Sequence, residues 1–465
     1  MTRIYGGIPN EGIFLYAEKM RDVLSRPHLH ELAVSCGFCK RNGKLKPEVF
    51  FALLFYTVSH TEEGSLSYMV SLLKSEFGIC IKKQSLHERF TDRSVSFVKS
   101  VLAEVINEQF CNLYSKEFLP EYARILIKDS TKFFTPSTLS DNYKSCGNGR
   151  SKSSISIQYE FDLKSGSVTY LEITSGNRND RTDAEATCEN TENGDLIIRD
   201  MGYFCTSVLK KWSCTDAKKV FYISRLDCNT NVYDSNGERV CFQKVYKSMR
   251  DGKIIEMEMQ VFIGEQTRLP VRLLLRLVPD EVYEKRIVEK TKKSKGQGRG
   301  QLTNETKRRC RFTLFITNAD EATLSTSQVF LLYKLRWQIE LQFKGWKSVF
   351  KIDTLHRMKE HRYITLLYVK LMQVMLNMQI IYSVQRSIIQ KDYKKIKIIS
   401  VNKSLKTLKR LFYKTFIMFC GVSRKFKEIA QHIHNVLSED HLLESKNKKI
   451  CFPEILQLLI CISEK

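Results

Sequence analysis

The chain has 465 residues, of which 43% are hydrophobic, and it carries 75 lysines and arginines against 51 aspartates and glutamates, a formal net charge of +24. This length is too great for one ordinary domain and sufficient to bury a large core, so two or three folded lobes are expected. The positive excess favours a polyanionic partner such as nucleic acid over general solubility, because lysine and arginine neutralise phosphates.

The chain contains 14 cysteines, scattered without the regular spacing of a disulfide framework, and the sequence after Met1 does not resemble a signal peptide. Free thiols in a reducing cytoplasm are therefore expected rather than secretion. One group, His28, His30, Cys36 and Cys39, combines an H-x-H with a C-x-x-C. A zinc site is the alternative interpretation of these four residues. A single C-x-x-C is a weak signal, so free thiols remain the preferred interpretation.

Residues 1–120 are predicted to be a helical region. Apolar residues recur at intervals of three and four from Leu66 to Phe77, and Gly78 then supplies a stop. Ser85 and Glu88 have the spacing of a capping box, which predicts that a second helix opens there. Two helices around a tight turn are typical of a helix-turn-helix, but the same pattern builds plain bundles, and the residues favour neither.

Residues 121–225 are predicted to be a block of alternating strands and helices. A short apolar run ends at Asp129, and another, Leu196 to Arg199, ends at Asp200. Between them, alternation from Ile155 to Leu163 predicts a strand that turns back into a second strand. Carboxylates at the ends of core strands commonly project into a site above the sheet, which makes the two aspartates candidate site residues.

Residues 226–311 are predicted to be an inserted β-rich module, since the helical pattern gives way to two runs of alternating apolar residues. Its end is strongly basic, with eleven lysines and arginines against three glutamates from Glu284 to Arg311. A mobile, solvated loop is the simpler interpretation of this stretch. Contact with DNA phosphates, through Arg299 and Arg308 among others, is the sharper one.

One long helix is predicted from Ser325 to beyond Phe350. Its core side is a stripe of apolar residues at intervals of three and four: Leu332, Leu335, Ile339, Phe343, Trp346 and Phe350. A second line follows one residue later, at the border of the buried face: Tyr333, Arg336, Glu340, Lys344 and Lys347. The position of Glu340 among basic residues can be explained by ion pairs with Arg336 and Lys344, each one helical turn away. Its combination with Asp129 and Asp200 favours a functional site.

The spacing of the second line carries a family resemblance. Tyr333, Arg336, Glu340 and Lys347 fill the pattern Y-x2-R-x3-E-x6-K, which resembles the YREK signature of DDE transposases of the insertion-sequence-four family. The stretch Lys128-Asp129-Ser130-Thr131 is similar to the first aspartate motif of that family, and Asp200-Met201-Gly202-Tyr203-Phe204 to the second. Thr317-Asn318 and Ser85 to Phe90 also have counterparts there. The resemblance covers Pro47 to His361.

The resemblance implies an α/β protein with an RNase H-like catalytic core that a mainly β insertion interrupts. The implied divisions are residues 1–120 for the DNA-binding region, 121–225 and 312–360 for the two parts of the core, 226–311 for the insertion, and 361–465 for a helical C-terminal region that is a candidate dimerisation surface.

The resemblance also implies the site chemistry. Asp129, Asp200 and Glu340 would be the catalytic residues, and their carboxylates would hold two magnesium ions, for which manganese can substitute. Tyr333 and Arg336, together with Lys344 and Lys347, would hold the DNA phosphates beside the reacting bond.

The implied function is transposition. Such a protein binds the inverted-repeat ends of its element in double-stranded DNA, cleaves the donor and joins the 3′ ends to target DNA as a homodimer. A nuclease of the same fold that cuts without joining, and a decayed transposase that only binds DNA, are the alternatives. The route of second-strand cleavage, through a DNA hairpin or otherwise, is also left open.

The implied location is the bacterial cytoplasm, in association with the nucleoid. The longest apolar stretch, Ile364 to Tyr382, contains Lys370, Gln373, Asn377 and Gln379 at positions that a bilayer would penalise. A buried helix is therefore expected there, and no membrane partner.

Overall fold

A computed structural model describes residues 11–41, 43–60, 64–109, 118–147, 151–213, 218–296, 298, 300–391, 397–419, 426–443, 455 and 459. The chain folds as two compact units. Unit 1 comprises residues 1–118, 130–178 and 337–458, and unit 2 comprises residues 119–129, 179–336 and 459–465. The chain passes from one unit to the other inside β1 (Arg124–Thr135) and again between α12 (Thr326–Leu335) and α13 (Trp337–Ser348).

Unit 1 is mainly helical. Besides α13, its helices are α1 (Glu11–Val23), α2 (Arg26–Ser35), α3 (Pro47–His60), α4 (Leu66–Phe77), α5 (Lys83–His87), α6 (Asp92–Asn107), α14 (Glu360–Lys391), α15 (Val401–Arg410), α16 (Phe412–Phe419) and α17 (Phe426–Asp440), with a short 3₁₀ helix, η1 (Ser137–Leu139). Its strands are β2 (Ser153–Asp162), β3 (Val168–Ser175) and the second half of β1, in the order β3-β2-β1.

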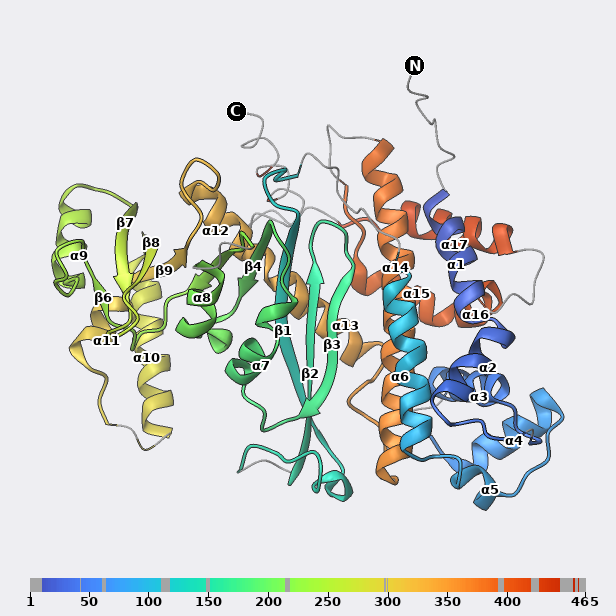
Figure 1. The fold of residues 1–465 in the computed structure, drawn as a ribbon. Coiled ribbons are helices and arrows are strands. Elements are labelled where there is room, and N and C mark those ends of the chain that lie inside the picture. The colour runs from blue at the N-terminus through green and yellow to red at the C-terminus, as the bar shows by residue number, and fades with distance from the viewer. Residues whose placement is uncertain are drawn as a thin grey trace. The chain divides into compact units, whose positions relative to one another are not determined.

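The long helix α14 is the core of unit 1. Figure 1 shows it in orange alongside α6, and α1 and α3 also pack against it. Glu360–Ile389 is long and apolar enough to cross a membrane, but its most apolar window is entirely buried within the protein. Its polar residues have partners in the fold: the Lys370 ammonium donates to the carbonyl oxygen of Lys351 at 2.7 Å, and the Gln373 amide donates to that of Phe55 at 3.1 Å. The predicted buried helix is confirmed.

The N-terminal helices agree with the predicted pattern except at one cap. Gly78 ends α4 with a left-handed backbone (φ 65°), as predicted, because glycine has no Cβ to oppose that conformation. The capping box predicted at Ser85 is wrong, since Ser85 lies inside α5 and the carboxylate of Glu88 accepts from the Gln84 amide at 2.9 Å. The capping box belongs instead to Thr91 and Ser94, where α6 begins.

Unit 2 is built on a mixed sheet. Its strands are the first half of β1, β4 (Asp195–Arg199), β5 (Phe221–Arg225), β6 (Val232–Tyr233), β7 (Glu256–Ile263), β8 (Leu269–Leu277) and β9 (Phe312–Thr317), in the order β1-β4-β5-β9-β8-β7-β6. Strands β1, β4 and β5 run parallel. The remaining neighbours in the order β5-β9-β8-β7-β6 pair antiparallel. Besides α12, the helices are α7 (Asp180–Ala186), α8 (Thr206–Ser213), α9 (Phe242–Asp251), α10 (Asp280–Gly296) and α11 (Asn304–Arg309), with the 3₁₀ helices η2 (Cys188–Asn190) and η3 (Met201–Tyr203). The predicted α/β class is confirmed.

The insertion predicted at residues 226–311 is not mainly β. The two alternating runs form β7 and β8, as predicted, but the described part of this segment also contains α9, α10 and α11. The basic stretch predicted as a loop is largely helical. No residue of α10 is buried, so its sequence lacks the apolar stripe by which periodicity reveals a helix. Arg299 lies outside the described residues.

The helix predicted from Ser325 to beyond Phe350 is two helices. Ser325 caps the start of α12, as predicted, in a capping box with Gln328. At Arg336 the backbone N–H donates to the carbonyl oxygen of Tyr333 at 3.2 Å, a tighter step than in an α-helix, and α13 begins at the next residue. All six residues of the predicted core stripe are buried. The stripe is confirmed, and the continuity of the helix is wrong.

Candidate functional site

Asp129 and Asp200 lie on neighbouring parallel strands of unit 2. In the register of β1 and β4, Lys128 is opposite Arg199, and each of these residues immediately precedes one of the two aspartates. Adjacent strands are about 4.8 Å apart. The two carboxylates therefore arise side by side, at the edge where parallel strands commonly present functional groups.

The residues before the aspartates define which face of the sheet each side chain takes. Successive side chains on a strand point to opposite faces. The Lys128 ammonium and the Arg199 guanidinium share one face, since each lies 5.9 Å from the centre of the Tyr203 ring. Asp129 and Asp200 consequently project to the opposite face.

The last turn of α12 supplies a partner to each carboxylate. The guanidinium of Arg336 donates to Asp129 at 3.0 Å, and the hydroxyl of Tyr333 donates to Asp200 at 2.9 Å. The Asp129 and Arg336 side chains are at most 20% exposed, so this ion pair is shielded from water. Tyr333 and Arg336 are three residues apart on one helix face, which is how a single turn reaches both strands.

Burial raises the pKa of Tyr333, and the negative charge of Asp200 raises it further. The phenol is therefore a protonated donor throughout the neutral pH range. Its ring packs against Phe315 of β9, with centroids 4.4 Å apart, and the Arg336 guanidinium lies 5.8 Å from its centre. Tyr333 is thus fixed on both sides while it holds Asp200.

A buried ion pair supports the aspartate strands from the other face. The ammonium of Lys128 lies 2.5 Å from a carboxylate oxygen of Asp183 on α7, and both side chains are fully buried. The same ammonium donates to the Thr187 hydroxyl at 2.7 Å. Arg199 lies over Trp212 of α8 at 5.0 Å. The residue type before each aspartate therefore has a structural role that no spacing rule indicated.

Four other acids lie between or near the two aspartates in the sequence and are alternative candidates for the site: Asp141, Asp180, Asp183 and Asp195. Asp195 is buried and pairs with Arg124 at 2.7 Å, and Asp183 pairs with Lys128. Asp141 is exposed, and Asp180 lies at the start of α7, close to Gly202. Asp195 and Asp183 thus serve the packing of unit 2, which supports the preference for Asp129 and Asp200.

Glu340, Lys344 and Lys347 lie on α13, in unit 1. Glu340 is partly buried and Lys344 is exposed. The Lys347 ammonium donates to the carbonyl oxygen of Lys132 at 3.0 Å, and burial lowers its pKa. The structure thus brings Tyr333 and Arg336 to the two aspartates, while the other three residues of the predicted line belong to the other unit.

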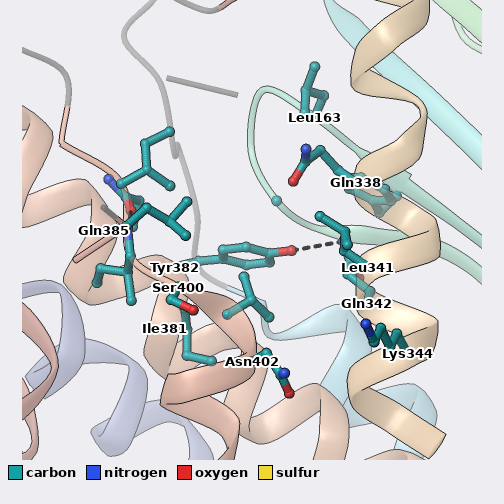
Figure 2. A pocket seen from close by; sticks show the side chains of 16 residues that line it. Leu163, Gln338, Leu341, Gln342, Lys344, Ile381, Tyr382, Gln385, Ser400 and Asn402 are labelled. Atoms are coloured by element: carbon teal, nitrogen blue, oxygen red, sulfur yellow. Dashed lines mark hydrogen bonds between the residues drawn. The ribbon is translucent and has the colours of Figure 1, made fainter. Parts of the chain in front are cut away.

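Gln342 fixes α13 within unit 1, a role that no sequence pattern indicated. Its amide oxygen accepts from the Tyr159 hydroxyl at 3.0 Å, and its amide nitrogen donates to the Tyr382 hydroxyl at 3.1 Å. Figure 2 shows the second bond at the wall of a largely apolar cavity of about 250 Å³. Gln342 thereby ties the helix that carries Glu340 to β2 and α14.

The Thr317-Asn318 pair lies at the end of β9. The side-chain oxygen of Asn318 accepts from the backbone N–H of Tyr222 at 3.0 Å, and its amide donates to the carbonyl oxygen of Val220 at 2.8 Å. Asn318 therefore extends the pairing of β9 with β5 beyond the last strand residue.

Within the described residues, no three His, Cys, Asp or Glu side chains gather around a point suited to one metal ion. The alternative zinc group is included in this statement: Cys36 instead lies 3.3 Å from the Ser100 hydroxyl, and the Cys39 thiol is 3.8 Å from the carbonyl oxygen of Arg41. In unit 2, the donor set of Asp129 and Asp200 fits magnesium chemically, because both offer hard carboxylate oxygens.

Comparisons with known proteins identify the family. The family model described as "Transposase DDE domain" matches residues 122–376, more than half of the chain. The transposase for insertion sequence element IS231F of Bacillus thuringiensis subsp. israelensis is 29% identical, over 82% of this chain and 83% of its own length. That for IS231B of B. thuringiensis subsp. berliner is 27% identical, over 82% and 83%. That for IS1151 of Clostridium perfringens is 26% identical, over 83% and 85%.

Proposed function

The chain belongs to the transposase DDE domain family, and we infer from this membership that it is a DNA transposase. It would bind the ends of an insertion sequence in double-stranded DNA, cleave the donor and join the 3′ ends to target DNA. The observation that carries the proposal is the pair of carboxylates on adjacent strand ends, Asp129 and Asp200, each held by a polar residue of one helix turn.

Asp129, Asp200 and Glu340 are the proposed catalytic residues, and their carboxylates would hold two magnesium ions, with manganese as a substitute. When bound, such ions lower the pKa of the attacking hydroxyl and stabilise the oxygen that leaves phosphorus. The support for Asp129 and Asp200 is their register in β1 and β4. The support for Glu340 is its place in the Y-x2-R-x3-E-x6-K pattern.

The bases next to the acids would hold the DNA. A guanidinium takes a phosphate through two parallel hydrogen bonds, and this role falls to Arg336, which holds the Asp129 carboxylate in the structure. Lys344 and Lys347 would supply point charges along the same strand of DNA. Tyr333 would keep the Asp200 carboxylate in a fixed orientation.

The wider organisation is also part of the proposal. Parallel β1, β4 and β5 in unit 2, and antiparallel β2 and β3 in unit 1, support an RNase H-like core. Residues 1–120 would bind DNA, and residues 361–465 would pair two copies on two element ends. Such a protein would act in the bacterial cytoplasm, in association with the nucleoid.

The test is a strand-transfer reaction. Purified protein is incubated with Mg²⁺, a duplex that carries the inverted repeats flanking its own coding region, and a supercoiled target plasmid. The expected products are cleaved ends joined to the plasmid. Asp129→Asn, Asp200→Asn and Glu340→Gln should each abolish both steps and leave DNA binding intact.

Two outcomes would overturn the proposal, and each favours a different function. Cleavage without any joined product would favour a nuclease of the same fold. DNA binding without cleavage by the unaltered protein would favour a transposase that has lost catalysis.

A further inference from the structure

A second basic site lies in the insertion of unit 2. It is a pocket of about 370 Å³, and its lining residues come from α9, α10, α11 and the residues around them. We call it the α11 pocket. Its lining includes the tyrosines Tyr246 and Tyr283, the cations Lys307, Arg308 and Arg311, and two side-chain amides, with no acidic residue among the described lining. The composition of this hollow is that of an anion site.

Arg311 is held in place by the two tyrosines. Its guanidinium carbon lies 3.8 Å from the centre of the Tyr283 ring and 4.9 Å from that of Tyr246. One of its nitrogens lies 2.5 Å from a carboxylate oxygen of Asp280, whose side chain is 81% exposed. An exposed acid compensates a charge only weakly, because water screens it. Arg311 is therefore a fixed cation with part of its charge still available.

The basic run on α11 divides into two roles. Arg309 is buried: it pairs with Glu305 at 3.0 Å and donates to the carbonyl oxygens of Cys228 and Thr230. Lys307 and Arg308 instead line the pocket, and among the described residues neither has an acidic partner. Three cations thus share one hollow, and their one acidic partner within the described residues is the exposed Asp280 beside Arg311, so a bound anion would relieve the remaining repulsion.

We propose that the α11 pocket binds a phosphate group of the DNA backbone, at a place on the element end separate from the reacting bond. Phosphate is the anion that arginine and lysine side chains take in combination, the first through paired hydrogen bonds and the second as a point charge. The site would fix the position of the DNA and read no base. This inference rests on the proposed function, because it takes DNA to be the partner.

The experiment compares two charge-matched double variants. Lys307→Ala/Arg308→Ala removes two positive charges from the pocket, and Lys210→Ala/Lys211→Ala removes two exposed charges from α8 outside it. Affinity for the inverted-repeat duplex is measured over a range of salt concentrations. Each neutralised phosphate contributes about 0.9 to the slope of log affinity against log salt. The pocket variant should lower the steepness by about 1 to 2, and the control should keep the slope of the unaltered protein.

A scan of the duplex with single neutral methylphosphonates locates the contact. The unaltered protein should lose affinity at one or two backbone positions, and the pocket variant should be insensitive there while the control variant stays sensitive. Equal slopes for both double variants, or the same scan for all three proteins, would overturn the proposal. A third result would also overturn it: the pocket variant binds DNA as well as the unaltered protein does, but loses binding to an acidic peptide. The pocket would then be a protein-docking site.

Failure of the proposed function is seen separately. If the unaltered protein binds the duplex but does not cleave it with Mg²⁺, the catalytic proposal fails, and the comparison of salt slopes still decides whether the pocket binds phosphate.

Discussion

Asp129 and Asp200 each have a polar partner from the last turn of α12, and the two partners differ in charge. Arg336 neutralises Asp129, whereas Tyr333 donates a hydrogen bond to Asp200 and adds no charge. A cation near Asp129 must share that carboxylate with Arg336 or displace it. A cation near Asp200 can leave the Tyr333 hydrogen bond in place.

The Tyr333 hydroxyl is the first side-chain group to test. Tyr333→Phe keeps the ring that packs on Phe315 and removes only the donor to Asp200. Groups that orient a metal ligand typically contribute about 10- to 100-fold in metal affinity or activity. We expect the Mg²⁺ concentration for half-maximal cleavage to rise by about 10-fold or more, equally across the neutral pH range. An unchanged Mg²⁺ requirement would mean that Tyr333 does not orient Asp200.

Removal of one partner from the buried pair of Lys128 and Asp183 is expected to destabilise unit 2. Lys128→Met leaves a buried carboxylate without its partner, which typically costs about 3–5 kcal/mol. Chemical denaturation should show this loss in the free energy of unfolding. Lys128→Met/Asp183→Leu removes both charges and should be clearly more stable than the single variant. If the double variant is the less stable of the two, the pair does not act as a coupled unit.

The sequence indicated two candidate acids but not their surroundings. Asp129 and Asp200 followed apolar strand runs, and that local signal was sufficient to single them out. The partners of Asp195 and Asp183 are Arg124, 71 residues away, and Lys128. Contacts of this kind depend on strand register and helix placement, so no local pattern in the sequence indicated that Asp195 and Asp183 would pair with these two cations.

The elements that carry the proposed site are α12 and α13, and each is anchored within its own unit. Ser325 and Gln328 cap the start of α12, and Tyr333 packs against β9. Gln342 holds α13 against β2 and α14. The single residue between the two helices, Arg336, is the one that binds Asp129.

Gln342 provides the test at this scale. Gln342→Leu keeps a similar volume but leaves the buried hydroxyls of Tyr159 and Tyr382 without this partner. An unsatisfied buried group costs about 1–3 kcal/mol. We expect a lower melting temperature and slower cleavage, with DNA affinity unchanged.

Gln338→Leu is the matched control, because Gln338 lines the same cavity from the same helix (Figure 2). It should leave the melting temperature and the cleavage rate close to those of the unaltered protein. Equal losses in the two variants would show that the cavity wall, and not the Gln342 hydrogen bonds, holds α13.

The elements were predictable where residue type is periodic. The stripe from Leu332 to Phe350 comes from one buried helix face, and such a face leaves a pattern in the sequence. Strands β2 and β8 alternate in residue type although most of their residues are buried. Helix α10 buries no residue, so its sequence contains no such periodic pattern. The break at Arg336 keeps a helical backbone (φ −50°, ψ −34°), so neither glycine nor proline marks it.

The chain crosses between its two units at several points, and two of these crossings lie beside a proposed site residue. Unit 2 ends within β1 at Asp129, and its last residue before α13 is Arg336. Asp129, Asp200 and Arg336 thus belong to unit 2, and Glu340 to unit 1. Glu340 was proposed from the family resemblance. That resemblance could be recognised in the sequence because the spacing of residues along one helix is a local property.

Pairing of two copies is a prediction for the complex with DNA. The net charge of +24 opposes close association of two chains in the absence of a polyanion. Two element ends would neutralise much of it. Light scattering should give the mass of two chains and two duplexes for the complex. A complex of one chain with one duplex that still joins DNA would contradict this prediction.

We propose that Asp129, Asp200 and Glu340 hold the metal ions. Substitution of each carboxylate by a cysteine thiol is the most direct test of this proposal. Magnesium demands hard oxygen ligands, whereas manganese binds softer donors more readily. We therefore measure end cleavage by Asp129→Cys, Asp200→Cys and Glu340→Cys in Mg²⁺ and in Mn²⁺, with Asp141→Cys as the control. We predict that the three variants are inactive in Mg²⁺ and recover in Mn²⁺, while the control is active in both. Full activity of any of the three in Mg²⁺ would contradict it.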